Sequence, residues 1–246
     1  MDFTFRTEPA AFLRRPNRFR VEARLADGLV IAAHCPDPGR LAELLLPDVT
    51  VHVSPAAVGT RKTGYDLRFV EHPQTGQLIS LDSRLPNQLF REGLAQGFFP
   101  AFHGVQAVDA EVTVPGGGQT RHGVRSRLDY RLTLAGGQVC WVEVKSATLV
   151  VDGVARFPDA PTDRGRRHLA ELAELAAAGQ RAAVVFIVQR PDAVAVAANR
   201  ATDPEFARVL DAVRTRGVEA YAATCALSTT TIRLANLIPV LRQGMT

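Results

Sequence analysis

The chain has 246 residues, 46% of them hydrophobic and 22% charged, a composition that excludes disordered, collagen-like and coiled-coil proteins. Its length suits one large domain or two small ones, and we expect two. The net charge of +4 modestly favours a polyanionic partner. No stretch is apolar for long enough to cross a membrane, and arginines occur at the start, where a signal peptide needs an apolar core, so we expect a cytoplasmic protein without membrane contact.

The N-terminal third has the pattern of short strands. Residues 19–25 alternate apolar and polar side chains, the dipeptide Asp27-Gly28 favours a tight turn, and residues 29–33 return as a second strand. Further strands are expected at 49–53 and 65–70, with a helical turn at 41–46 before them. This count fits a small closed barrel such as the oligonucleotide-binding (OB) fold, although the pattern alone fits any small β-domain nearly as well.

After about residue 85 the pattern changes to alternating helices and strands. Apolar periodicity and glycine stops predict helices at 87–97, 163–178 and 204–216, and strands at 108–114, 127–134, 139–145, 182–188 and 218–223. This strand–helix–strand–helix–strand order predicts an α/β domain with a mixed sheet. We place the boundary within 80–86, which gives an OB-like domain at 1–82 and an α/β domain at 83–246.

Only two of the 29 basic residues, Lys62 and Lys145, are lysines. Where a sequence strongly prefers arginine, a remaining lysine is more often found where a compact, rotatable ammonium is needed. The three cysteines are far apart and form no CxxC pair, so the sequence supports neither a disulfide framework nor a zinc ribbon. The rarity of lysine therefore makes Lys145 a candidate functional residue.

The clearest chemistry lies in the hairpin expected at 127–145. Glu143 and Lys145 are two residues apart in one strand and so project from the same face. With a two-residue turn Asp129 would lie on the other face, whereas a three-residue turn at 135–137 places it directly opposite Glu143. The carboxylates would then offer oxygen ligands to Mg²⁺, and Lys145 a positive charge to a scissile phosphate or an attacking water. A structural salt bridge explains the same spacing equally well.

The same residues resemble a known family. An aspartate followed by glutamate-x-lysine in a hairpin is the pattern of the PD-(D/E)xK nuclease superfamily, and the chain resembles more narrowly the sugar fermentation stimulation protein A (SfsA) family. The matching motifs run in order along nearly the whole chain: R-P-N-R-F at 15–19, H-C-P-D-P-G-R at 34–40, R-K at 61–62, L-P-N at 85–87, S-R-L-D at 126–129, V-E-V-K-S at 142–146, F-P-D-A at 157–160, R-G-R-R-H-L at 164–169 and V-Q-R at 188–190. The chain departs from the family at Asp37-Pro38, where Asn-Thr is more frequent.

The resemblance implies an N-terminal OB barrel, a C-terminal PD-(D/E)xK nuclease-like α/β domain, DNA as partner and a regulatory link to sugar (maltose) metabolism. It gives metal roles to Asp129 and Glu143 and the catalytic-lysine role to Lys145. The cofactor that it implies is Mg²⁺ or Mn²⁺. If the chain is a phosphodiesterase, we expect the Val144 carbonyl to help to hold the metal.

Other side chains are expected to complete the site. The superfamily usually has a further acidic residue; spacing does not decide between Glu111 and Glu92, and Glu111 is included here among the catalytic candidates. Cations at the start of the helix at 163–178 oppose the helix dipole, so phosphate contact explains them better than helix stabilisation. For His168, a capping or partly buried role is as good an explanation as phosphate contact.

Arginines also alternate beside Phe19 near the N-terminus, as expected where phosphates and a stacked base meet one barrel face. A solvated face with Phe19 in the barrel core is the alternative. The expected nucleic-acid contacts are Arg15, Arg18, Phe19, Arg40, Arg61, Lys62, Arg127, Arg164, Arg167 and His168.

Two functions compete. The chain is either a Mg²⁺-dependent phosphodiesterase acting on DNA or a non-catalytic DNA-binding regulator of sugar (maltose) metabolism that uses a nuclease-like scaffold. The joint presence of Asp129, Glu143 and Lys145 favours the phosphodiesterase.

Overall fold

The first five strands of the chain close into a barrel. The computed structural model describes residues 1–56, 63–115 and 126–242, and in it the barrel order is β3–β2–β1–β4–β5, closed by a parallel pairing of β3 with β5. The strands are β1 (Glu8–Asn17), β2 (Arg20–Leu25), β3 (Val30–His34), β4 (Thr50–Pro55) and β5 (Tyr65–Glu71), and β6 (Leu78–Ser80) extends the edge of β5. The expectation of a small closed barrel is confirmed.

Alternating side chains fill the barrel. Val21 and Ala23 of β2 point inward and are buried, and Gly28 adopts a left-handed backbone (φ 88°) in the turn to β3. The sequence pattern does not reveal β1, because register shifts near Arg14 and Asn17 interrupt its pairing with β2.

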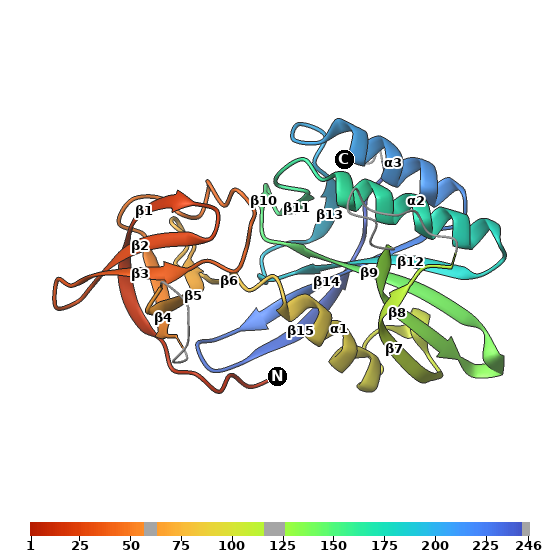
Figure 1. Ribbon diagram of the computed structural model, residues 1–246, viewed down its shortest axis with the longest axis horizontal. Helices are drawn as coiled ribbons and strands as arrows, with labels where there is room; N and C mark the ends of the chain where they lie inside the picture. Colours follow the sequence, from red (N-terminus) through yellow and green to blue (C-terminus); the bar gives the residue numbers. More distant parts are fainter. Residues whose placement is uncertain (57–62, 116–125, 243–246) are drawn as a thin grey trace.

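A six-stranded mixed sheet forms the second part of the molecule, in the order β15–β14–β12–β9–β8–β7 (Figure 1). β9, β12 and β14 run parallel to one another, whereas β7, β8 and β15 are antiparallel to their neighbours. The strands are β7 (Val105–Thr113), β8 (Arg127–Leu134), β9 (Val139–Ala147), β12 (Arg181–Val188), β14 (Glu219–Leu227) and β15 (Ile232–Ile238). The mixed α/β domain expected from the sequence is confirmed.

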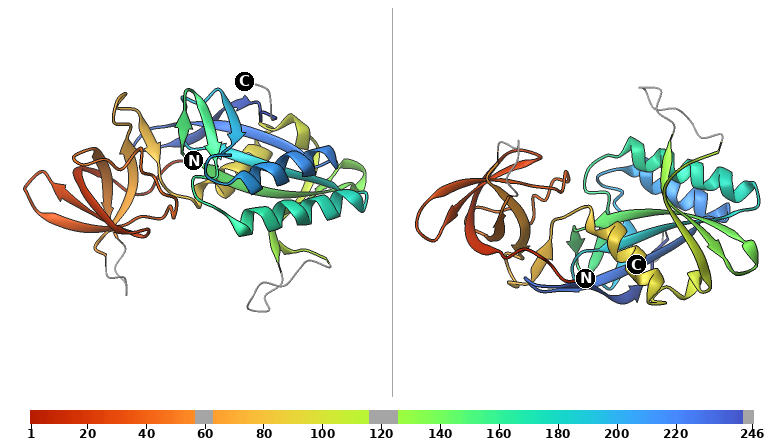
Figure 2. Two further views of the ribbon diagram at one scale, coloured as in Figure 1. Left: turned by 90° about the horizontal axis from the view of Figure 1, so that it is seen from above. Right: turned by 60° about the horizontal axis from the view of Figure 1, so that its bottom comes forward.

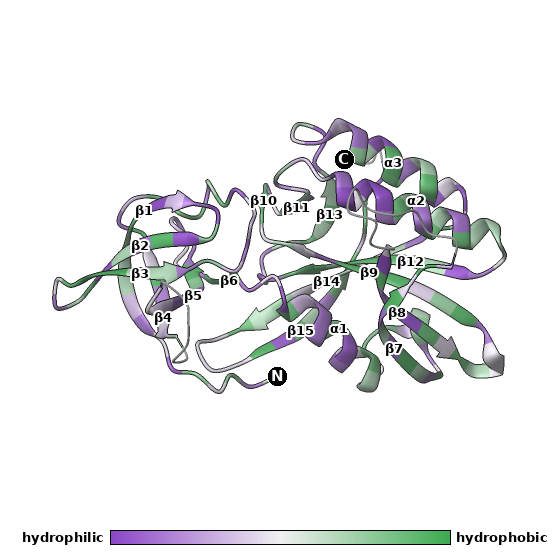
Figure 3. Ribbon diagram, in the orientation of Figure 1, coloured by the Kyte–Doolittle hydropathy of each residue, from purple (hydrophilic) through white to green (hydrophobic). Residues whose placement is uncertain are grey.

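Helices cover both faces of this sheet (Figure 2). α2 (Asp163–Ala177) and α3 (Pro204–Thr215) pack on one face, and α1 (Leu85–Ala95) packs on the other. The side chains of β12 alternate between the two layers: Val184 and Phe186 join the core under α2, and Val185 joins the core under α1. Hydrophilic and hydrophobic residues alternate along α2 and α3, as expected for helices with one face on a sheet (Figure 3).

Several small elements lie outside the expectations from sequence. β10 (Val150–Val151), β11 (Val154–Phe157) and β13 (Ala195–Ala198) form a separate three-stranded sheet, and short 3₁₀ helices occur at η1 (Pro100–Phe102) and η2 (Ala135–Gly137). Within the described residues, no helix has both the length and the apolar character needed to cross a membrane.

The barrel and the α/β part meet between a barrel loop and the connection from β11 to α2. The backbone N–H of Arg40 donates to Oδ2 of Asp159 at 2.8 Å. The neighbouring Gly39 leaves room for this contact, because a Cβ there would lie 2.2 Å from the same oxygen. Both parts therefore border one cleft.

Candidate metal and nucleic-acid site

The turn between β8 and β9 sets the register on which the site depends. It consists of three residues, Ala135–Gly137, and its two glycines have left-handed φ angles of 77°. In this register Tyr130 pairs with Val142. The next position along both strands brings Asp129 opposite Glu143. Of the two turns considered from sequence, the three-residue turn is the one that forms.

Asp129 lies where the β8–β9 ladder ends. Its Oδ2 accepts the backbone N–H of Val144 at 2.7 Å, and its Oδ1 accepts a longer hydrogen bond of 3.3 Å from the Asn87 amide in α1. Burial raises the pKa of Asp129 to about 6, and the nearby charge of Glu143 adds to this shift. The two carboxylates therefore repel each other, and a cation between them would relieve that repulsion.

Glu143 is almost fully buried, and its two oxygens have different surroundings. Oε1 accepts hydrogen bonds from Nζ of Lys145 at 2.5 Å and from Nδ1 of His168. Burial alone would raise the pKa of Glu143, but the Lys145 charge and the His168 contact outweigh it and hold the pKa at about 2. Oε2 is buried and has no hydrogen-bond partner among the described residues. Glu143 is therefore ionised with one oxygen free.

These side chains border a cleft of about 600 Å³ that both parts of the molecule line. The charged lining residues are the acidic Asp37, Asp129, Glu143 and Asp159 and the basic Arg18, Lys145, Arg156 and Arg164. Arg18 and Asp37 come from the barrel, and the others come from the α/β part. Such a mixture of charges suits a phosphate group held next to a divalent cation.

The donor set fits a hard divalent cation. Such ions prefer carboxylate, amide and backbone oxygens. Near the carboxylate of Asp129, Oε2 of Glu143 and Oδ1 of Asn87 are buried and have no partner among the described residues. In the part of the chain that the structure describes, no group of three or more His, Cys, Asp or Glu side chains is arranged to hold a metal. Amide and backbone oxygens and water would therefore complete the coordination, and Mg²⁺ in particular usually keeps several waters beside one or two carboxylates.

Neither candidate for an additional acidic ligand reaches the cleft. Glu111 lies in β7 with a left-handed φ of 53°, is exposed to solvent and is absent from the cleft lining. Oε2 of Glu92 instead lies 3.2 Å from the N-terminal ammonium of Met1. The expected catalytic role of Glu111 is therefore not supported by its position, and the group beside Asp129 is the Asn87 amide.

The barrel residues expected to bind nucleic acid differ in their surroundings. Arg15 donates to the backbone carbonyls of Asp37, Gly39, Arg40 and Arg18, so its guanidinium braces the barrel loop rather than facing a phosphate. Arg18 lines the cleft. Phe19 beside it is 49% exposed and stacks on His34 with a centroid distance of 6.3 Å, so its ring is outside the barrel core.

Of the remaining basic candidates that the structure describes, one lines the cleft. Arg164 is exposed and lines it. Arg40 and Arg127 are exposed but do not line the cleft. Arg167 is half-buried, and its Nε lies 3.9 Å from Oε1 of Glu171 in the same helix. The Arg61-Lys62 pair lies outside the described residues.

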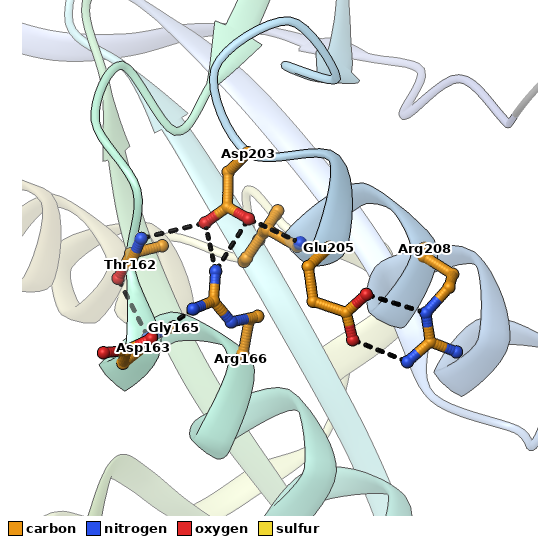
Figure 4. A network of polar contacts seen from close by, with 8 residues as sticks. Thr162, Asp163, Gly165, Arg166, Asp203, Glu205 and Arg208 are labelled. Atoms are coloured by element: carbon orange, nitrogen blue, oxygen red, sulfur yellow. Dashed lines mark hydrogen bonds and ion pairs between the residues drawn. The ribbon is translucent and has the colours of Figure 1, made fainter.

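A polar network fixes the start of α2 (Figure 4). Thr162 caps the helix by accepting the N–H of Gly165 at 3.0 Å. Asp203 accepts the Thr162 N–H at 2.9 Å and the Arg166 guanidinium at 2.6 Å. It also caps α3 by accepting the N–H of Phe206 at 2.8 Å. The first turns of the two helices are thereby tied together.

His168 follows this network in the second turn of α2. It is only 1% exposed and its Nδ1 contacts Glu143, so it does not face nucleic acid. This position agrees with the buried role considered from sequence rather than with phosphate contact. Its contact joins residues 25 positions apart on a helix and a strand, and no spacing rule marks such a pair. The role of Asn87 escapes sequence reasoning for the same reason.

The chain is similar to known proteins over nearly its whole length. Two family models match it, the SfsA N-terminal OB domain over residues 13–81 and the sugar fermentation stimulation protein RE domain over residues 84–231. A sugar fermentation stimulation protein homolog from Moorella thermoacetica is 47% identical over 226 residues, which cover 92% of each chain. One from Geobacter sulfurreducens is 39% identical and covers 93% of this chain and 94% of its own. The structure of Pyrococcus furiosus SfsA in complex with Ca²⁺ has a TM-score of 0.83 and 31% identity and covers 98% of both chains.

Proposed function

The chain belongs to the sugar fermentation stimulation protein family, and we propose that it is a phosphodiesterase that acts on DNA and depends on a divalent cation. The observation that carries this proposal is Oε2 of Glu143, which is buried near Asp129 in a cleft that Lys145 also lines and has no hydrogen-bond partner in the part of the chain that the structure describes. A buried carboxylate oxygen without a partner is unfavourable unless a cation binds it. The Ca²⁺ in the Pyrococcus furiosus relative supports a divalent cation as the cofactor.

The roles of the side chains follow from their positions. The groups that would hold the cation are the carboxylates of Asp129 and Glu143, Oδ1 of Asn87 and the Val144 carbonyl. When bound, Mg²⁺ or Mn²⁺ polarises a phosphate and makes water more acidic. The ammonium of Lys145 lies 2.5 Å from Oε1 of Glu143. From there it can neutralise the charge that develops on a phosphate or orient the attacking water.

The rest of the cleft would bind the DNA backbone. Arg18, Arg156 and Arg164 line it from the barrel, β11 and α2 respectively. The guanidinium carbon of Arg18 lies 5.8 Å from the ring centroid of Phe19, which is exposed. An exposed ring beside a guanidinium allows a base to stack while its phosphate is neutralised. DNA would therefore extend from the cleft onto the barrel.

Cleavage assays test this function. The purified protein is incubated with labelled single-stranded, duplex and branched DNA in Mg²⁺, in Mn²⁺ or in EDTA. We expect cleavage that requires a cation and is lost in Lys145→Ala and Glu143→Gln. Glu174→Gln, which alters an exposed glutamate of α2, is the matched control and should cleave like the parent. Cleavage that persists in Glu143→Gln would contradict the proposed metal role.

The same assay separates the second candidate, a DNA-binding regulator of sugar (maltose) metabolism. The ion pair between Lys145 and Glu143 is the observation that favours it, because a buried pair of this kind is also found as a purely structural contact. DNA that is bound but never cut would support the regulator. Both candidates require affinity that falls between about 50 and 200 mM salt, because phosphate contacts release counterions.

A further inference from the structure

The two donors to Oε1 of Glu143 are not equivalent. Lys145 reaches this oxygen through a flexible side chain, whereas His168 is a planar ring held in α2 and buried to 1% exposure. A carboxylate only accepts hydrogen bonds, so Nδ1 of His168 carries the hydrogen. The imidazole thereby links α2 to Glu143 of β9, whose other carboxylate oxygen, Oε2, has no partner among the described residues.

Packing alone does not require a polar ring at this position. Leu169 and Leu172 of α2 are apolar and belong to the core under the helix. The other buried polar side chain of α2, Glu171, has its own partner in Ser126. Burial of an imidazole is unfavourable unless its N–H finds a partner. A leucine at position 168 would avoid this penalty, so the contact with Glu143 best explains the histidine.

We propose that His168 is a positioning residue, which holds Oε1 of Glu143 so that Oε2 stays available to the divalent cation. This inference rests on the phosphodiesterase function proposed above. When Lys145 also contacts a phosphate or the attacking water, its hydrogen bond to Oε1 would weaken, and the donor left to keep the carboxylate from rotating would be His168. The network around Asp203 fixes the helix that carries this donor.

Calorimetric titration of the full chain with Ca²⁺ alone tests the proposal without any need for catalysis. His168→Leu removes the donor and should weaken Ca²⁺ binding by about tenfold or more, the usual effect of losing a group that orients a ligand. His168→Asn carries an amide nitrogen close to the position of Nδ1 and should bind Ca²⁺ like the parent. His168→Gln places its nitrogen nearer the position of Nε2 and should behave like the leucine variant.

Melting temperatures in EDTA are measured for every variant. If His168→Leu does not fold, the comparison of the Asn and Gln variants decides. Equal Ca²⁺ affinity in all three variants and the parent would overturn the proposal. An equal loss in the Asn and Gln variants would also overturn it, because the ring would then serve packing alone.

Glu143→Gln is titrated beside these variants so that two different failures are kept apart. If Glu143→Gln binds Ca²⁺ as tightly as the parent, the metal site of the proposed function is wrong, and so is the role of His168 that depends on it. If Glu143→Gln loses Ca²⁺ binding while the His168 variants keep it, only the role of His168 is wrong.

Discussion

The carboxylate of Asp203 should make a large single contribution to the stability of the α/β part. It is 2% exposed and accepts the N–H groups of Thr162 and Phe206 as well as the Arg166 guanidinium. Asp203→Ala removes the cap of α3, which contributes about 1 kcal/mol. It also leaves the Thr162 N–H and part of the guanidinium unpaired, at about 1–3 kcal/mol. The expected loss is therefore about 2–4 kcal/mol.

Thermal unfolding followed by circular dichroism measures this loss. For a chain of this size each kcal/mol lowers the melting temperature by about 2–4 °C, so Asp203→Ala should melt roughly 4–16 °C below the parent. Glu205→Ala breaks the exposed pair with Arg208 in the same region (Figure 4) and should melt with the parent, since exposed pairs contribute little. A melting temperature of Asp203→Ala within about 2 °C of the parent would refute the reasoning.

Three other changes give different readouts. Gly39→Ala places a Cβ 2.2 Å from Oδ2 of Asp159 and should loosen the contact between the barrel and the α/β part. Limited proteolysis should then cleave the chain between β6 and α1 faster than in the parent. An unchanged cleavage rate would contradict this prediction. Burial raises the pKa of Asp37 to about 6, so its contribution to stability is present below its ordinary pKa of 3.8 and is lost as the pH rises through 6. The melting temperature of Asp37→Asn should therefore exceed that of the parent at pH 8, and the difference should shrink toward pH 4. Equal melting temperatures at pH 8 would contradict this prediction. Phe19→Ala should weaken single-stranded DNA binding in EDTA by ~1–3 kcal/mol, measured by fluorescence anisotropy, whereas Phe19→Trp should retain it; no loss in Phe19→Ala would show that the ring does not stack.

Elements with strong periodicity were predictable from the sequence. The hairpin of β8 and β9 and the helix α2 each show the period of one type of element, and the short apolar run of β12, rich in β-branched residues, is typical of a buried strand. β10, β11 and β13 are two to four residues long, too short for any alternation to show. β1 is hidden by its irregular register.

Part of the candidate site could be predicted from the sequence and part could not. Strand alternation alone places Glu143 and Lys145 on one face, whereas Asp129 joins them only with the three-residue turn, which is one of the two turns that the sequence allows. The contacts of Asn87 and His168 with these carboxylates depend on how helices pack on the sheet. That packing is set by the whole core, so no local pattern reveals these contacts.

Cation-dependent DNA cleavage by the parent and by Glu143→Gln, measured beside the melting temperatures of the same preparations, tests the metal-dependent function most directly. The parent should cleave in Mg²⁺ or Mn²⁺ and not in EDTA. Glu143→Gln should fail to cleave while it keeps DNA affinity in EDTA, because the loss of a carboxylate also reduces repulsion of the phosphates. Parental cleavage by Glu143→Gln, or a large drop in its melting temperature with no change in its response to the cation, would contradict the metal role of this residue.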